Sequence, residues 1–255
     1  MAGIALPTVP TKIPHNLARA PLVEAIFEFR FTPAQSSVAQ LLPGLIFSKL
    51  SGKYDRSEAT PVASIPPEIR AKHSDLRYQA QHRLSGERAS VFIGDRVAGV
   101  SITRPYEGWR RFRPRILEFL EVLQTSKLVE RGERFSIKFV NIIPSAPGQQ
   151  LALLNLRLEV GGIGAPENGF RFRTEINDET YIRIIQIVTN AETDISSQEK
   201  ISGLLLSLDC IRVLRNEDFW QEHPSGIDQV HDQLKHLFFG LITEKTLESL
   251  EPSYD

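Results

Sequence analysis

The stretch PLVEAIFEFRF, residues 21–31, decides the fold. Every second position from Val23 to Phe31 is apolar, whereas charged residues fill most positions between them, with Ile26 as the exception. The charged positions are Glu24, Glu28 and Arg30. This alternation predicts a strand that begins after a proline and buries one of its two faces. The chain therefore contains a sheet with one face in the core.

The same reasoning predicts further strands along the chain. Alternating or continuously apolar runs, bounded by turn residues such as Gly94 and Asp95, mark them. They are expected at residues 76–84, 88–94, 96–104, 134–144, 151–160, 169–177, 180–188 and 200–214. Residues 54–75 contain three prolines and show no period, so a long loop is expected there.

Apolar residues at helical spacing predict helices at residues 35–51, 107–123 and 225–246. Pro43 and Gly44 disturb the first of these patterns. A few helices among many strands indicate an α+β fold with antiparallel sheets. We expect two sheet-and-helix halves, each closed by one of the two long amphipathic helices.

These elements divide the chain into an arm and two halves. Residues 1–20 contain three prolines and little charge, which is typical of an extended arm. The two halves would span residues 21–145 and 146–255, with a boundary near Pro144. A single continuous domain fits the same pattern, because 255 residues also suit one large domain.

The composition is that of an ordinary globular protein. With 41% hydrophobic and 24% charged residues, the chain can bury a core without a disulfide or a metal. Its apolar runs are shorter than the roughly 18 residues of a membrane span. The first residues lack a signal-peptide pattern, so the expected location is the cytoplasm. The single cysteine, Cys210, lies in an apolar run and is expected to be a buried small hydrophobic residue, not a catalytic thiol.

The net charge of -1 hides an asymmetry along the chain. Residues 77–115 contain nine arginines against three acids, whereas residues 216–255 contain nine acids against two lysines. This division indicates that the two regions face each other, within one molecule or between neighbours, or that each meets a different partner. It disfavours a chain that binds nucleic acid non-specifically over its whole surface.

Motifs for catalysis and for cofactors are missing from the sequence. The glycine-rich segment 161–164 precedes a strand and lacks the lysine of a phosphate loop, so a hairpin turn is expected. The histidines form no metal-binding motif, and no cofactor or metal is expected. Glu24 and Glu28 are too far apart along a strand for a carboxylate pair. Asp209, flanked by apolar residues, is expected to be an edge residue or to form an ion pair with Arg212 or another arginine.

Four arginines lie in the segment RPYEGWRRFRPRILEFL, residues 104–120, namely Arg110, Arg111, Arg113 and Arg115. On the predicted helix, Trp109, Phe112 and the aliphatic residues form one stripe that faces the core, and the arginines fan out over the remaining surface. Three interpretations are open. The arginines are solvated or form intramolecular ion pairs, they bind an acidic protein partner, or they bind nucleic acid, and the fan favours them in that order.

The sequence also resembles a sporadically distributed bacterial family, whose members carry a Pro-Val-x-Glu-Ala strand, a Tyr-x-Gly-Trp-x-x-Phe helix start and a strand ending in Tyr-Ile-Asn-x-Ile. The corresponding residues are Pro21, Val23, Glu24, Ala25, Tyr106, Gly108, Trp109, Phe112, Asn141, Ile143, His231 and Phe238. This chain departs from the family where Lys138, Phe139 and Val140 replace the usual Arg-Tyr. The resemblance covers nearly the whole chain and implies an accessory gene, such as one in a defence or toxin–antitoxin cassette, without implying a mechanism.

Two main hypotheses of function follow. The first is a non-catalytic binding protein that docks a protein partner or self-associates as a homo-oligomer through the arginine-bearing helix. The second is a cleft between the two halves that binds an anion or small ligand, with or without catalysis. Its candidate residues are Tyr106, Arg157, Arg171, Arg173 and Asp209. Nucleic-acid binding is the third and least favoured alternative.

Overall fold

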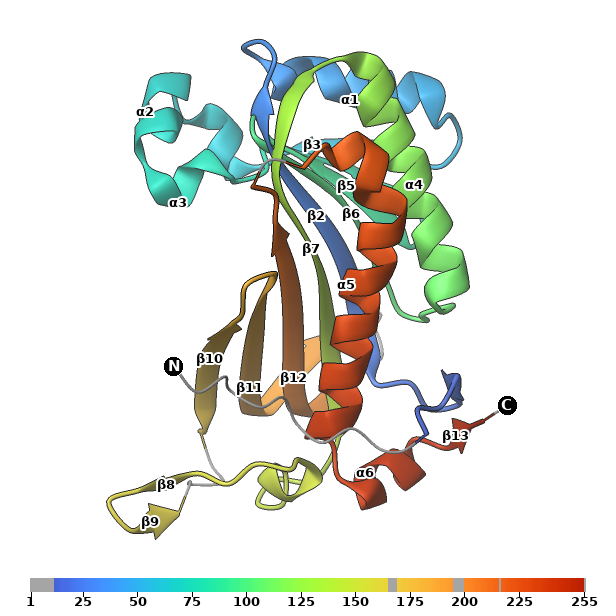
Figure 1. Ribbon diagram of the computed structural model, residues 1–255, viewed down its shortest axis with the longest axis vertical. Helices are drawn as coiled ribbons and strands as arrows, with labels where there is room; N and C mark the ends of the chain where they lie inside the picture. The colour runs from blue at the N-terminus through green and yellow to red at the C-terminus, as the bar shows by residue number, and fades with distance from the viewer. Residues whose placement is uncertain (1–11, 165–168, 195–199, 216, 255) are drawn as a thin grey trace.

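One antiparallel sheet of nine strands forms the centre of the computed structural model, which describes residues 12–164, 169–194, 200–215 and 217–254 (Figure 1). The strand order is β10-β11-β12-β7-β2-β6-β5-β4-β3. The strands are β2 (Leu22–Pro33), β3 (Arg56–Ala59), β4 (His82–Ser85), β5 (Ala89–Ile93), β6 (Val97–Thr103), β7 (Val129–Pro144), β10 (Arg171–Asn177), β11 (Tyr181–Asp194) and β12 (Lys200–Val213). The fold is therefore α+β with an antiparallel sheet, as predicted.

The long strand β7 lies between strands from both predicted halves. Its Phe139 is opposite Ala25 of β2 on one side and opposite Leu208 of β12 on the other. Strands that precede and follow the expected boundary near Pro144 thus hydrogen-bond within the same sheet.

Three helices pack along this sheet, namely α1 (Val38–Lys49), α4 (Trp109–Ser126) and α5 (Phe219–Leu241). α4 contacts β6, β7 and α1, while α5 contacts β7 and β12 (Figure 1). Phe27, Phe29 and Phe31 of β2 are fully buried in the core, and Phe29 stacks on Phe219 of α5 with ring centroids 4.1 Å apart. Each buried ring contributes about 1.5–3 kcal/mol, so the apolar face of residues 21–31 helps to hold the helices on the sheet.

The segment 54–75 is more ordered than the predicted loop. Besides β3, it contains η1 (Pro61–Ser64), α2 (Pro67–Lys72) and the first residues of α3 (Ser74–Arg77). The buried Arg70 holds it in place, because its guanidinium donates to the Asp95 carboxylate at 2.9 Å. The strand expected at residues 76–84 is correspondingly shorter, since Leu76 belongs to α3 and the strand begins only at His82.

The strand expected at residues 151–160 is wrong for most of its length. The segment has η2 (Leu151–Leu153), irregular backbone and a short hairpin of β8 (Glu159–Val160) with β9 (Ile163–Gly164). Leu154 forms an isolated bridge with Ile242, and the Asn155 amide donates to the Gly240 and Ile242 carbonyl oxygens at 3.2 and 3.0 Å. The leucines thus pack at the end of α5 instead of joining the sheet.

The helices expected at residues 35–51 and 107–123 are confirmed as α1 and α4. The helix expected at residues 225–246 is instead divided in two. α5 begins earlier because the Asp218 carboxylate caps its first turn, and it ends at Leu241. A new helix, α6 (Glu244–Ser249), follows because the Thr243 hydroxyl caps a fresh N-terminus.

The described part of the N-terminal arm is held by the other end of the chain. β1 (Asn16–Leu17) pairs with β13 (Pro252–Ser253) in a small antiparallel sheet. The Ala18 N–H also donates to the Glu251 carbonyl oxygen at 3.1 Å. Residues 1–11 of the expected arm lie outside the described residues.

Cys210 is fully buried on β12, as expected for a small hydrophobic residue, and burial raises the pKa of its thiol to about 12. Within the described ranges, no helix combines the length and the apolar character that crossing a lipid bilayer requires.

Candidate ligand-binding site

A pocket of about 400 Å³ lies between the N-terminal arm and helix α5. Four segments contribute to it: residues 14–17 and 20–22 of the arm and the start of β2, residues 106–109 leading into α4, the end of β7, and α5. We call it the aromatic pocket, and its characteristic residues are Tyr106, Trp109, Phe139, His231, Lys235 and Phe238.

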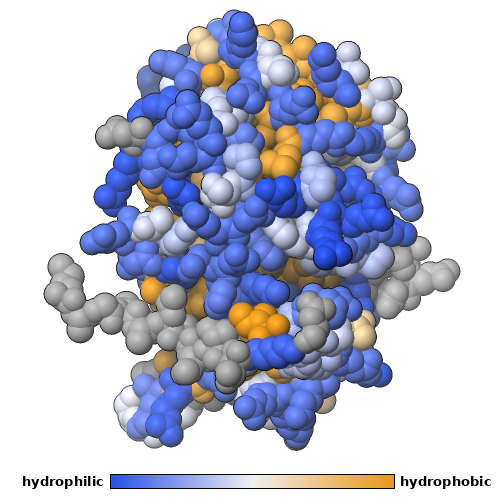
Figure 2. Space-filling model, turned by 45° about the vertical axis from the view of Figure 1, so that its right-hand side comes forward, coloured by the Kyte–Doolittle hydropathy of each residue, from blue (hydrophilic) through white to orange (hydrophobic). Residues whose placement is uncertain are grey.

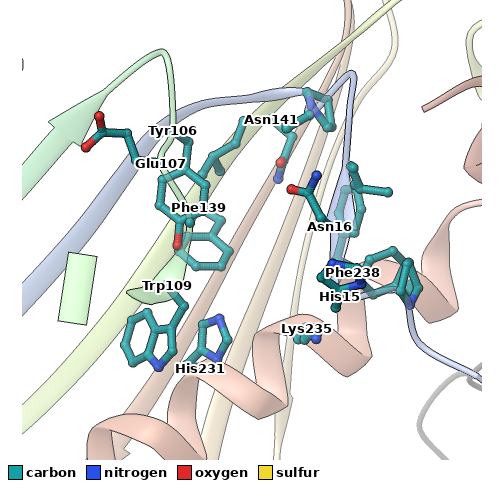
Figure 3. A pocket seen from close by; sticks show the side chains of 17 residues that line it. His15, Asn16, Tyr106, Glu107, Trp109, Phe139, Asn141, His231, Lys235 and Phe238 are labelled. Carbon is teal, nitrogen blue, oxygen red and sulfur yellow. The ribbon is translucent and has the colours of Figure 1, made fainter. Parts of the chain in front are cut away.

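Aromatic rings form most of one wall of the pocket. The Trp109 indole stacks on the His231 imidazole, with ring centroids 4.1 Å apart and planes 12° from parallel. The Phe139 ring lies 6.0 Å from the Tyr106 ring and 6.0 Å from the His231 ring. In Figure 3 these four rings lie on one side of the pocket, opposite Phe238 and the arm. Such walls suit a flat apolar molecule.

A carboxylate on α5, Asp228, fixes the geometry of this wall. Its Oδ1 accepts hydrogen bonds from Trp109 Nε1 at 3.0 Å and from Arg113 Nε at 2.7 Å, and its Oδ2 accepts from a second Arg113 nitrogen at 2.8 Å. The two-point contact with the guanidinium ties α4 to α5. Gly108 precedes the helix with φ +86°, a left-handed conformation that favours glycine. The indole is therefore positioned by hydrogen bonding as well as by packing.

The Tyr106 hydroxyl is a buried polar group of the pocket. Its oxygen is buried and has no hydrogen-bond partner among the described residues. Burial raises the pKa of this phenol well above its ordinary value, so the hydroxyl keeps its proton at neutral pH. An unsatisfied buried hydroxyl costs about 1–3 kcal/mol. A ligand atom that hydrogen-bonds to it would recover that free energy.

Further polar side chains come from the arm, the loop before α4, β7 and α5. Asn141 is buried, and its amide nitrogen donates to the Leu206 carbonyl oxygen at 3.0 Å. Asn16 and Asn141 lie toward the end of the pocket away from Trp109 (Figure 3). Desolvation lowers the pKa of His231 despite the nearby Asp232 carboxylate, so the imidazole is uncharged at neutral pH.

A second cleft, of about 800 Å³, lies on the other side of the loop that leads into α4. We call it the arginine groove; it is lined by Lys53, Arg88, Arg110, Arg111 and Arg115 together with Glu87, Glu107 and Glu118. Lys53 pairs with Glu118, and Arg88 lies 3.8 Å from Glu87. The other three arginines form no ion pair with a described residue. In Figure 2, hydrophilic side chains cover most of the side of the molecule where α4 lies.

The four arginines of α4 thus separate into two groups. Arg113 turns toward α5 and forms the intramolecular ion pair with Asp228. Arg110, Arg111 and Arg115 line the arginine groove. Phe112 is fully buried and Trp109 packs against the core, as the predicted stripe requires.

The five residues proposed for a ligand cleft do not converge. Tyr106 lines the aromatic pocket, whereas Arg157 is exposed in the irregular segment before β8. Arg171 and Arg173 are exposed on the edge strand β10. Asp209 lies on β12 between Leu208 and Cys210, which are both buried in the core, so it points to the opposite face of the sheet.

Asp209 is a buried acid without the expected arginine partner. Its Oδ1 has no hydrogen-bond partner in the described part of the chain. Desolvation, and after it the charge of Glu28, raises the pKa of this carboxyl to about 6. Arg212 does not pair with it, because alternation places the guanidinium on the other face, where it binds Glu217 at 2.9 Å and Glu222 at 3.0 Å.

Sequence reasoning missed most of the aromatic pocket. His231, Lys235 and Phe238 recur at i, i+4 and i+7 on α5, which places them on one face, and this spacing was the available signal. Several residues of the motifs quoted in the sequence analysis line the pocket, namely Pro21, Tyr106, Gly108, Trp109, Asn141, His231 and Phe238. Among the described residues, no cluster of three or more His, Cys, Asp or Glu side chains could hold a metal ion.

Comparison with known proteins gives no further guide to function. No family model matches the chain, and no curated protein matches it. The geometry of the chain's own residues therefore carries the functional inference.

Proposed function

We propose that this protein is a non-catalytic binding protein whose aromatic pocket holds a small molecule with a flat apolar body. The observation that carries the proposal is the buried Tyr106 hydroxyl, which lacks a partner at the wall of a pocket of about 400 Å³. Pockets for small molecules commonly have volumes of about 300–1,000 Å³, apolar walls and a few convergent polar groups. A bound molecule supplies the partner that the hydroxyl lacks.

The chemistry of the lining favours binding over catalysis. The described residues around the pocket include no serine, threonine or cysteine that could act as a nucleophile. Burial raises the pKa of the Tyr106 hydroxyl, so this group keeps its proton and does not act as a base near neutral pH. The family resemblance suggests that the protein is encoded by a bacterial accessory gene, such as one in a defence or toxin–antitoxin cassette.

Isothermal titration calorimetry with 2-naphthol, a flat bicyclic molecule with one hydroxyl, tests this proposal. We expect binding that weakens at least about tenfold in Trp109→Ala, which removes the stacking wall, and about threefold to tenfold in Tyr106→Phe. The matched control is Trp220→Phe, because Trp220 lies outside the pocket and packs against Phe29 and Phe219. The absence of binding, or equal affinity in Trp109→Ala, would contradict the proposal.

A second candidate function is docking of an acidic protein partner or of a second copy in the arginine groove. The observation that favours it is that Arg110, Arg111 and Arg115 line the groove without an acidic partner among the described residues. The glutamates in the same groove would repel a continuous phosphate backbone, so nucleic acid is disfavoured. Electrostatic attraction between these arginines and an acidic partner is strong at low salt and weak at high salt.

Light scattering coupled to size exclusion, at 50 mM and 500 mM NaCl, tests this second candidate. We expect an assembly that dissociates in high salt, and that is lost when Arg110 and Arg111 are both replaced by glutamate. Replacing the exposed Arg157 and Arg171 by glutamate makes the same change in net charge elsewhere and serves as the control. A monomer in both salts, with no partner recovered by affinity capture at low salt, would reject this candidate.

A further inference from the structure

We infer that the molecule bound in the aromatic pocket is a monoanion, a flat aromatic carboxylate whose charge lies against the ammonium group of Lys235. This inference rests on the proposed function and adds the chemical class of the ligand. Three features of the pocket carry it: the position of Lys235, the lack of a compensating charge, and the placement of the rings.

Lys235 belongs to the pocket by its position on α5. It follows His231 by one turn and precedes Phe238 by another, so all three lie on one face of the helix. All three line the pocket, and Figure 3 shows Lys235 between the other two. Its side chain is partly buried, and it forms no ion pair with a described residue. A ligand in the pocket thus meets an ammonium group without a counter-charge.

The other charged groups near the pocket do not neutralise this ammonium. The Glu107 side chain points away from the aromatic rings in Figure 3 and also borders the arginine groove. Asp228 is occupied by the two-point contact with Arg113. Asp232 is exposed and lies 3.4 Å from the ring nitrogen of His231. The pocket therefore presents one unpaired positive charge, and a charge removed from water is stabilised by an opposite charge.

The rings and the hydroxyl define the rest of the ligand. The stacked pair of Trp109 and His231 gives a flat apolar surface near Lys235, which suits an aromatic ring. A carboxylate carries the single negative charge that the Lys235 ammonium lacks, and its oxygens accept hydrogen bonds from N–H and O–H donors of the pocket. A single cation matches one negative charge. A dianion such as a phosphate monoester would leave a charge unpaired.

Three probes with the same ring test the charge: 2-naphthoate, 2-naphthamide and 2-naphthylmethylamine, which are anionic, neutral and cationic at pH 7.5. With isothermal titration calorimetry in 50 mM NaCl, we expect the acid to bind at least about tenfold more tightly than the amide, and the amine most weakly. Raising the salt to 500 mM should reduce the preference for the acid and leave the affinity for the amide nearly unchanged.

Substitutions of Lys235 locate the charge. In Lys235→Met, which keeps an unbranched side chain without the charge, we expect acid and amide to bind within about threefold of each other. In Lys235→Arg the preference for the acid should persist, because the charge is kept. The matched control is Lys245→Met, since Lys245 is an exposed lysine on α6 outside the pocket. This control should retain the preference of the unmodified protein.

The outcomes separate the inference from the proposed function. If the amide binds and the acid binds no more tightly, the ligand class is wrong and the pocket still binds flat molecules. If the preference for the acid survives in Lys235→Met, the charge lies elsewhere and the inference is also overturned. If neither the acid, nor the amide, nor 2-naphthol binds, the proposed function fails together with it.

Discussion

The aromatic pocket and the arginine groove lie on the two sides of the loop that leads into α4, and both are bordered by Glu107. In the pocket aromatic rings predominate, and the buried Tyr106 hydroxyl lacks a hydrogen-bond partner among the described residues. In the groove the charges are many, and most of the arginines are exposed to water. An unpaired charge in water costs little, whereas an unpaired buried hydroxyl costs about 1–3 kcal/mol. The pocket is therefore the stronger indication of a ligand.

The largest expected effect is a difference in stability between variants of two neighbouring residues on α4, Trp109 and Arg110. Trp109→Ala removes a stacked indole and its hydrogen bond to Asp228, so we expect the free energy of unfolding to fall by about 3 kcal/mol. Arg110 is the next residue along the chain and lines the arginine groove. Arg110→Ala should change the free energy of unfolding by less than about 0.5 kcal/mol. Urea denaturation followed by circular dichroism measures both. Similar losses in the two variants would remove the contrast between pocket and groove.

A second test uses the Asp209 carboxylate, a buried polar group that lies outside both the aromatic pocket and the arginine groove. The pKa of Asp209 is about 6 in the folded protein, above its unfolded value, so the ionised carboxylate opposes folding. Asp209→Asn should therefore raise the free energy of unfolding by about 2 kcal/mol at pH 7.5, and this gain should disappear as the pH falls through 6 toward 4. Denaturation at several pH values checks it. A variant less stable at pH 7.5 would indicate that the carboxylate has a stabilising partner.

A smaller effect is expected for Tyr106→Phe. Removal of a buried hydroxyl that lacks a partner should stabilise the empty protein by about 1 kcal/mol, while the affinity for 2-naphthol falls. Thermal denaturation with and without 2-naphthol measures the two changes together. If the variant loses stability and keeps its affinity, the hydroxyl has a structural role and the pocket loses its main evidence.

The smallest effect is expected for Arg111→Ala. Its guanidinium is exposed and unpaired, so the free energy of unfolding should change by less than about 0.5 kcal/mol. Any salt-dependent association of the protein should weaken nonetheless, which light scattering at 50 mM NaCl would measure. A destabilisation above 1 kcal/mol would mean that the groove is part of the folded framework and not a free surface.

The fold was predictable from the sequence where each signal is local. The alternation in residues 21–31 and the apolar stripe around Phe112 arise within one element, and burial in the structure follows both patterns. Segment 54–75 was mispredicted because its helices are too short to show a period, and because Arg70 orders it through the distant Asp95. Residues 151–160 were mispredicted because their leucines pack against α5 from irregular backbone.

The candidate site was much less predictable, because its walls come from four separate segments of the chain. The sequence analysis named Tyr106 as a candidate residue. The other walls of the pocket belong to β7 and α5, which only the folded chain brings next to Tyr106. The pairing of Arg113 with Asp228 joins residues 115 positions apart. The i, i+4 spacing places Arg113 on the same helix face as Trp109, but it does not identify Asp228 as the partner of Arg113.

The pairing of β1 with β13 has a consequence for synthesis of the protein. Residues 14–17 and 20–22 line the pocket, and the backbone N–H groups of His15 and Ala18 donate to the carbonyl oxygens of Ser253 and Glu251, which are translated after all nine strands of the sheet. The nine-stranded sheet is complete by Val213, so it can assemble on the ribosome before those residues emerge. The pocket can close only afterwards. A polypeptide interrupted by a late stop codon would keep its sheet and lose the strand that holds this part of the pocket.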